Sequence, residues 1–336
     1  MGNRAITFRE NTHLTKTRSL LSTLWFYQNF DLKCCARVGI LLYWKKIKSI
    51  SKGLTNMNGA ELLERYAAGE REFRSVDLQG AFLGGADLSG ASLREANLQG
   101  ANLIGASLVR VNFRDADLSE ASLQADLTEA NLISTNLTGA KLTGARLLDV
   151  SLRAANLSRA TLRAANLSNA MLNEADLRDA DLSRAKLIGC NFGRTKLMNC
   201  NLSEADLQNS NLTSAILMNA DLRGANLSGA ILNGANATGA NAEGADFSRA
   251  NLNGSNLTNI VLRQANLRAA TLTWTTLRGA DLTEANLYRA KLCWSNLTGA
   301  TLVDAVLIDA NLHEINLKNA DLTRAIMPNA GSSSER

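Results

Sequence analysis

The stretch ANLQGANLIG, residues 96–105, holds two copies of the five-residue unit that decides the fold. An apolar residue occupies every fifth position from Phe73 to Leu123; the next is Leu127, one residue early, and the period then holds to Met327. This gives 52 units, and we name the apolar residue the centre of its unit. Two residues before the centre, 38 units have Ala, and directly before it 31 have Asn or Asp, so the consensus is Ala-(Asn/Asp)-Leu-x-x.

A period of five matches neither the 3.6-residue period of a helix nor the two-residue period of a long strand. In a short extended segment, residues two apart point to the same side, so the Ala and the Leu face inward and the Asn or Asp faces outward. Because five is odd, the last two residues must turn the chain before the next Leu can face inward. A corner in every unit winds the chain into a coil whose backbone groups pair with the coils above and below.

Weak echoes at 20 residues indicate how many units close one coil. The dipeptide Gln-Gly at 79–80 returns at 99–100, and Trp274 returns as Trp294. We therefore expect four units per coil and a square cross-section. The 52 units would make about 13 coils, and at a strand spacing of ~4.8 Å the rod would be roughly 60 Å long.

These units strongly resemble the pentapeptide-repeat family. The resemblance covers residues 71–327 and is carried by runs such as ADLSGASLREANL (86–98) and ADLTEANLYRA (280–290). It implies an all-β fold, a right-handed quadrilateral β-helix. Residues 58–73 resemble the lead-in of many cyanobacterial members. The family is functionally diverse, so the resemblance implies a fold more firmly than a function.

The centres form the predicted core, a column of mostly Leu side chains. Its members include Leu78, Leu127, Leu207 and Phe247. Two adjacent centres, at 237 and 242, are Ala, and we expect a cavity or a pinched coil there, filled in part by Phe247. The residue missing before Leu127 predicts a local kink or bulge.

The two ends of the rod differ in the cover that the sequence offers. Residues 58–70 predict a capping helix, because Asn58 followed by Glu61 matches a capping box. Little follows Met327, and we expect residues 328–336 to be disordered. An open coil exposes unpaired backbone groups, so the C-terminal coil is a candidate for end-on pairing with a second copy of the chain.

Outward positions carry the candidate interaction surfaces. Trp274 and Trp294 would share one column of the rod, with Tyr288 near them in sequence. Exposed aromatic side chains are favoured at interfaces, so this is the first candidate. Met198 and Met218 form a smaller second candidate.

The sequence does not predict catalysis, a cofactor or a metal site. Its two histidines, His13 and His313, lie 300 residues apart, and no glycine-rich phosphate loop is present. Cys190 and Cys200 occupy inward small-residue positions, which favours buried fillers over ligands or a redox pair.

Residues 1–57 differ from the rest of the chain. They carry ten Lys or Arg and two acidic residues, a net charge of +8, whereas residues 58–336 carry −3. Interrupted apolar runs beside lysines are typical of a segment that lies on a membrane surface. Non-specific nucleic-acid binding, or a native product that begins at Met57, are the alternatives.

Three functions remain open from the sequence. The first is a non-enzymatic scaffold for a protein partner, and we expect it in the cytoplasm. The second is DNA mimicry of the kind that the resemblance implies for gyrase-binding members, which needs a strongly negative face because DNA carries one charge per ~1.7 Å. The third is a membrane-peripheral protein tethered by residues 1–57. The near-neutral rod disfavours mimicry and makes nucleic-acid binding by the rod as a whole an unfavoured hypothesis.

Overall fold

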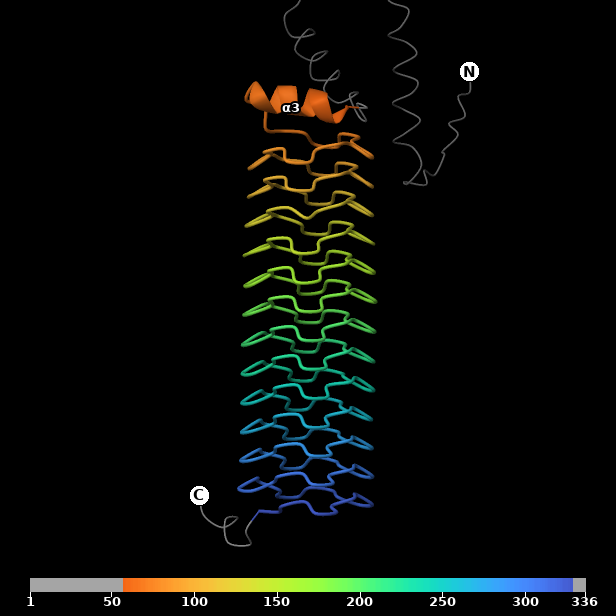
Figure 1. Cartoon of the computed structure of the whole chain (residues 1–336), viewed down its shortest axis with the longest axis vertical. Helices are drawn as coiled ribbons and strands as arrows, with labels where there is room; N and C mark the ends of the chain where they lie inside the picture. Colours follow the sequence, from red (N-terminus) through yellow and green to blue (C-terminus); the bar gives the residue numbers. More distant parts are fainter. Residues whose placement is uncertain (1–56, 329–336) are drawn as a thin grey trace, which may run out of the picture. The chain divides into compact units, whose positions relative to one another are not determined.

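The computed structural model describes residues 57–328, which form one short helix followed by a stack of coils (Figure 1). The helix, α3, spans Gly59–Ala67. The coils that follow contain no strand longer than a single bridging residue. The expectations for the basic segment 1–57 and for a disordered tail fall almost wholly outside the described residues and stay predictions.

Parallel bridges join each unit to the unit 20 residues further on. Asp77 bridges Asn97, and Asn97 in turn bridges Asp117. The same pairing continues to the bridge between Val306 and Ile326. Four units therefore make one coil, with one face and one corner contributed by each unit.

Every backbone N–H of a regular unit has a partner, as the unit Ala96 to Gly100 illustrates. Two N–H groups donate to the next coil, one to the preceding coil and one to the preceding unit. The fifth, on the residue after the centre, donates to the side chain of the Asn or Asp. In order along the unit, the bonds are Ala96 N to Leu93 O (3.2 Å), Asn97 N to Val76 O (2.9 Å), Leu98 N to Asp117 O (2.7 Å), Gln99 N to Asn97 Oδ1 (3.2 Å) and Gly100 N to Ser119 O (2.8 Å).

The side-chain bond explains why Asn and Asp dominate the position before the centre. Their short side chains reach a backbone N–H two residues on, which closes an Asx-type turn. Amides of neighbouring coils also bond to one another, as Asn97 Nδ2 does to Asp77 Oδ1 at 2.9 Å. The sequence predicted only that these residues face outward.

The last residue of a unit turns the corner in the left-handed region of φ. Glycine adopts this region without steric cost, but many units place larger residues there, such as Arg249 (φ 58°) and Trp274 (φ 60°). A left-handed residue other than Gly costs roughly 1–2 kcal/mol. The inter-coil hydrogen bonds hold the corner in place regardless of the side chain.

The predicted core is buried. Leu78, Leu127, Leu207 and Phe247 are each at most 1% exposed. Burial of one Leu contributes ~1.5–3 kcal/mol, so the column of centres supplies a large share of the stability. The two Ala centres at 237 and 242 are also buried, and their backbone N–H groups keep the usual bonds to the next coil, at 2.8 and 2.7 Å.

The missing residue before Leu127 is absorbed at one corner, and the expectation of a bulge is wrong. Ala125 N donates to Leu123 O at 2.8 Å, which replaces the usual corner with a tighter turn. Ala125 then also takes the small-residue position of the next unit. Bridges continue on both sides, from Ser107 to Asp126 and from Asp126 to Arg146, so the ladder keeps its register.

The helix α3 packs on the first coil. Asn58 is its N-cap, and its Oδ1 accepts a hydrogen bond from Glu61 N at 2.8 Å. This is half of a capping box, because the Glu61 carboxylate lies 3.9 Å from Arg65 instead. Leu62 is fully buried against the coil, and Tyr66 donates to the carbonyl oxygen of Ser89 at 2.8 Å.

The substitution Leu207→Arg tests the inward assignment of the centres. It places an unpaired charge in the middle of the core, and we expect a larger loss than the ~2–5 kcal/mol of a large-to-small core change. Thermal unfolding followed by circular dichroism measures it. Asn209→Arg is the matched control, because it adds the same charge at an exposed corner where Arg is accommodated elsewhere. Equal melting temperatures for Leu207→Arg and the parent would contradict the assignment.

Candidate functional site

Within residues 57–328, no group of three or more His, Cys, Asp or Glu side chains is placed to hold a metal ion. The same part of the chain contains no helix with the length and apolar character needed to cross a bilayer. The candidate sites of the described chain are therefore surfaces of the rod.

Cys190 and Cys200 lie inside the rod, as their inward positions predict. The Cys190 Sγ atom donates to the carbonyl oxygen of Leu167 at 2.9 Å. Burial raises the pKa of the Cys190 thiol to about 12 and also raises the pKa of Cys200 well above its usual range. Thiolates are the reactive form, so both residues act as packing groups. Cys293 is half-exposed at a corner.

Iodoacetamide labelling of the folded protein tests this difference. At mildly alkaline pH, we expect Cys293 to be alkylated while Cys190 and Cys200 stay unmodified until the chain is unfolded, because their thiols are protonated and covered. Peptide mass mapping before and after denaturation measures each site. Modification of Cys190 at the rate of Cys293 in the folded protein would show that the coil opens.

Trp274 and Trp294 stack on each other at one corner of the rod. Their ring centroids are 5.2 Å apart and the rings are 9° from parallel. Their residues remain 65% and 46% exposed. His313 meets Trp294 edge-on at 5.7 Å, a contact that the sequence analysis missed although the 20-residue spacing places position 313 next to 293. The predicted shared column is thus a continuous exposed aromatic surface.

Tyr288 belongs to a different group. It lies on the corner before that of the tryptophans, where the guanidinium groups of Arg268 and Arg289 lie 4.9 and 5.0 Å from its ring centre. Such contacts contribute about 0.5–1 kcal/mol at exposed sites. The structure thus places Tyr288 among arginines at the neighbouring corner.

Met198 and Met218 occupy equivalent positions on consecutive coils. Asn199 N donates to Met218 O at 3.0 Å, which fixes the two coils against each other. Met218 is exposed and Met198 is half-buried. They form a second, smaller apolar surface on the side of the rod.

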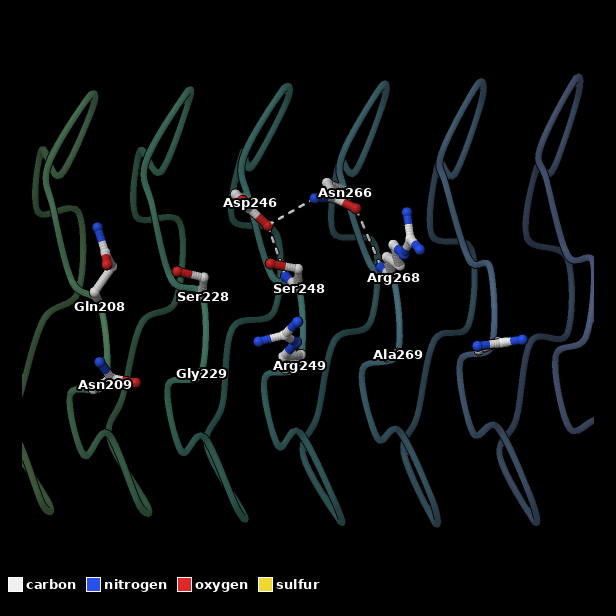
Figure 2. A pocket seen from close by; sticks show the side chains of 11 residues that line it. Gln208, Asn209, Ser228, Gly229, Asp246, Ser248, Arg249, Asn266, Arg268 and Ala269 are labelled. Carbon is white, nitrogen blue, oxygen red and sulfur yellow. Dashed lines mark hydrogen bonds between the residues drawn. The ribbon is translucent and has the colours of Figure 1, made fainter.

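A shallow groove on another corner was not foreseen from the sequence (Figure 2). Its volume is about 820 Å³, and its lining includes Arg249, Arg268 and Arg289. Asp246 Oδ1 accepts hydrogen bonds from Ser248 N (2.7 Å) and Asn266 Nδ2 (3.0 Å), so this carboxylate is engaged within the wall. The arginine side chains are the charged groups left to meet a ligand.

Ion pairs on the rest of the rod link side chains of successive coils. Arg184 pairs with Glu204 at 2.9 Å, and the hydrogen bond holds the pKa of Glu204 below its usual range. Arg194 pairs with Glu174 at 2.6 Å. Exposed pairs of this kind contribute roughly 0–1 kcal/mol each. They describe a solvated surface of mixed charge.

Comparison with protein families gives one description, "Pentapeptide repeats", in eight copies. They match residues 72–108, 91–125, 106–149, 145–184, 175–213, 215–254, 245–283 and 285–324. The comparison with curated proteins finds no match.

Several solved structures are similar to the chain. HetL, a pentapeptide repeat protein involved in heterocyst differentiation regulation in the cyanobacterium Nostoc, is 33% identical over 82% of this chain and 99% of its own, with a TM-score of 0.25. A pentapeptide repeat protein from the thylakoid lumen of Arabidopsis thaliana is 32% identical over 34% of this chain and 73% of its own, with a TM-score of 0.23. QnrB1, a plasmid-mediated fluoroquinolone resistance protein, is 19% identical over 62% and 90%, with a TM-score of 0.26.

Proposed function

We propose that this chain, which belongs to the pentapeptide-repeat family, is a non-enzymatic scaffold that binds a protein partner. The observation that carries the proposal is the stacked, exposed pair Trp274 and Trp294 on a rigid rod. Exposed Trp residues are enriched among the side chains that dominate binding energy. A stack fixed by the coil backbone also loses little conformational entropy on binding.

The family membership implies that the rod is a right-handed quadrilateral β-helix. We propose that its 52 units make about 13 coils and that α3 caps the first of them. The burial of Leu62 and the bond from Tyr66 to the first coils support the capping role. A capped rod is protected from edge-to-edge association at that end.

Two alternatives are kept as proposals of lower rank. DNA mimicry of the gyrase-binding kind requires dense negative charge, whereas residues 58–336 carry a net charge of only −3. A membrane-peripheral role would depend on residues 1–57, which lie outside the described residues except for Met57. A cytoplasmic location goes with the scaffold proposal.

Capture of partners by the full chain and by the double variant Trp274→Ala/Trp294→Ala tests the scaffold. Loss of two central aromatic side chains typically costs 2 kcal/mol or more, so we expect at least ~30-fold weaker retention of the partner. The control is Met198→Ala/Met218→Ala, which removes apolar side chains from the other surface. Equal retention by the Trp variant and the parent would move the binding surface elsewhere on the rod.

We also propose that the C-terminal coil pairs end-on with a second copy of the chain. Leu312, Leu317 and Leu322 are only half-buried. Their backbone N–H groups have no partner among residues 57–328, whereas the equivalent groups of earlier coils bond to the next coil. Open edges of this kind invite pairing.

Sedimentation equilibrium at micromolar concentration measures this association. We expect the mass of a dimer for the parent and of a monomer for Leu317→Lys, because the charge would be placed in the paired surface. A monomeric mass for the parent would refute the end-on pairing.

A further inference from the structure

A basic belt surrounds the rod at residues 247–280. This stretch contains four arginines and no Asp or Glu, and it spans almost two coils because one coil takes 20 residues. Arg263 pairs with Asp281 at 2.5 Å. Within residues 57–328, the other three, Arg249, Arg268 and Arg278, have no carboxylate partner. The nearly neutral charge of the rod as a whole therefore hides a local concentration of free cations.

An aromatic slot lies at the corner between these arginines. Trp294 covers one face of the Trp274 ring. The other face points toward the preceding coils, whose equivalent residues are Gly254 and Gly234. A Cβ atom at Gly254 would meet nothing within 4 Å. The next place in the stack is therefore vacant, and a planar group can enter it and lie on Trp274.

Amide side chains form one edge of this slot. Asn233 and Asn253 directly precede the two glycines. Asn253 Oδ1 accepts a hydrogen bond from Thr273 N at 2.9 Å, which leaves its Nδ2 as a donor. Asn233 Oδ1 is buried and has no partner among the described residues, so its amide gains a bond by turning toward a ligand. Amide groups pair well with the edges of nucleobases, whereas a phenyl ring offers them no hydrogen bond.

The free arginines flank the slot on both sides. Arg249 and Arg268 lie on the preceding corner and line the groove of Figure 2, and Arg278 lies on the following corner. Phosphate groups are the usual partners of arginines that lack a carboxylate. Stacking surfaces beside a positively charged groove are the combination that binds single-stranded nucleic acid.

We propose that a single-stranded nucleic acid binds the basic belt, with one base stacked on Trp274 above Gly254. Its phosphates lie near Arg249 and Arg268. The fixed coil spacing leaves the slot only as deep as the two glycines allow, so the site takes one or two bases. This activity goes beyond the scaffold role and does not depend on a protein partner.

Fluorescence anisotropy of a labelled oligothymidylate with the full chain tests the proposal. Gly254→Trp fills the slot with a ring from the protein itself, and Trp is already accommodated at the same φ at position 274. We expect Gly254→Trp and Trp274→Ala each to weaken binding about tenfold, the effect of one lost stacking contact. Gly144→Trp is the matched control, because its corner also has open space and lies outside the belt.

The phosphate contacts have a separate readout in salt dependence. Each single-strand phosphate contact contributes about 0.7 to the slope of log affinity against log salt. Arg249→Gln/Arg268→Gln should lower that slope by roughly 1.4, and Arg153→Gln/Arg159→Gln should leave it unchanged. All variants keep the ten basic residues of the segment 1–57, so only differences from the parent measure the belt.

Four results would overturn the proposal. They are no binding by the parent, binding by Gly254→Trp and Trp274→Ala equal to that of the parent, equal competition by thymidine monophosphate, and equal competition by a short peptide that contains Trp. The third result would assign the slot to a free nucleotide and the fourth to a protein side chain. Gly254→Trp also separates this site from the scaffold, because it enlarges the aromatic surface that a protein partner would use.

Discussion

The hydrogen bonds between one coil and the next are the constraint on which the rest of the structure depends. A coil of 20 residues has no internal ladder, so its backbone groups must find partners 20 residues away or in side chains. The unit meets this need at every N–H, and it does so only if all units have the same length. Five residues, with two facing inward and two turning, are what the pairing requires.

This constraint also accounts for residues that break local preferences. A left-handed backbone is unfavourable for Trp, Arg and Glu, yet they occupy it at corners throughout the rod because the bonds on both sides fix the turn. The exposed side chain at that position is then free to vary. The rod can therefore carry a Trp stack at one corner and an arginine groove at the next without change to its core.

The sequence predicted the features that follow from period alone. The inward Leu column, the 20-residue coil and the shared column of Trp274 and Trp294 all depend on counting residues. It did not predict features that depend on how side chains reach across corners. The bond from Asn or Asp to the backbone, the place of Tyr288 between two arginines and the tightened turn at Ala125 belong to this second class. The absence of acidic residues from 247 to 280 was visible in the sequence, but its meaning required the coil register.

Amide hydrogen exchange in two neighbouring units tests the account most directly. Leu212 N and Leu217 N both donate to the next coil, at 2.6 and 2.7 Å. Thr213 N donates to Asn211 Oδ1 at 3.0 Å, whereas Met218 follows a unit with Ile216 in place of Asn or Asp and has no such acceptor. The account predicts slow exchange at Leu212 and Leu217, slow exchange at Thr213 and fast exchange at Met218. Exchange at Leu212 and Leu217 as fast as at Met218 would contradict the inter-coil ladder.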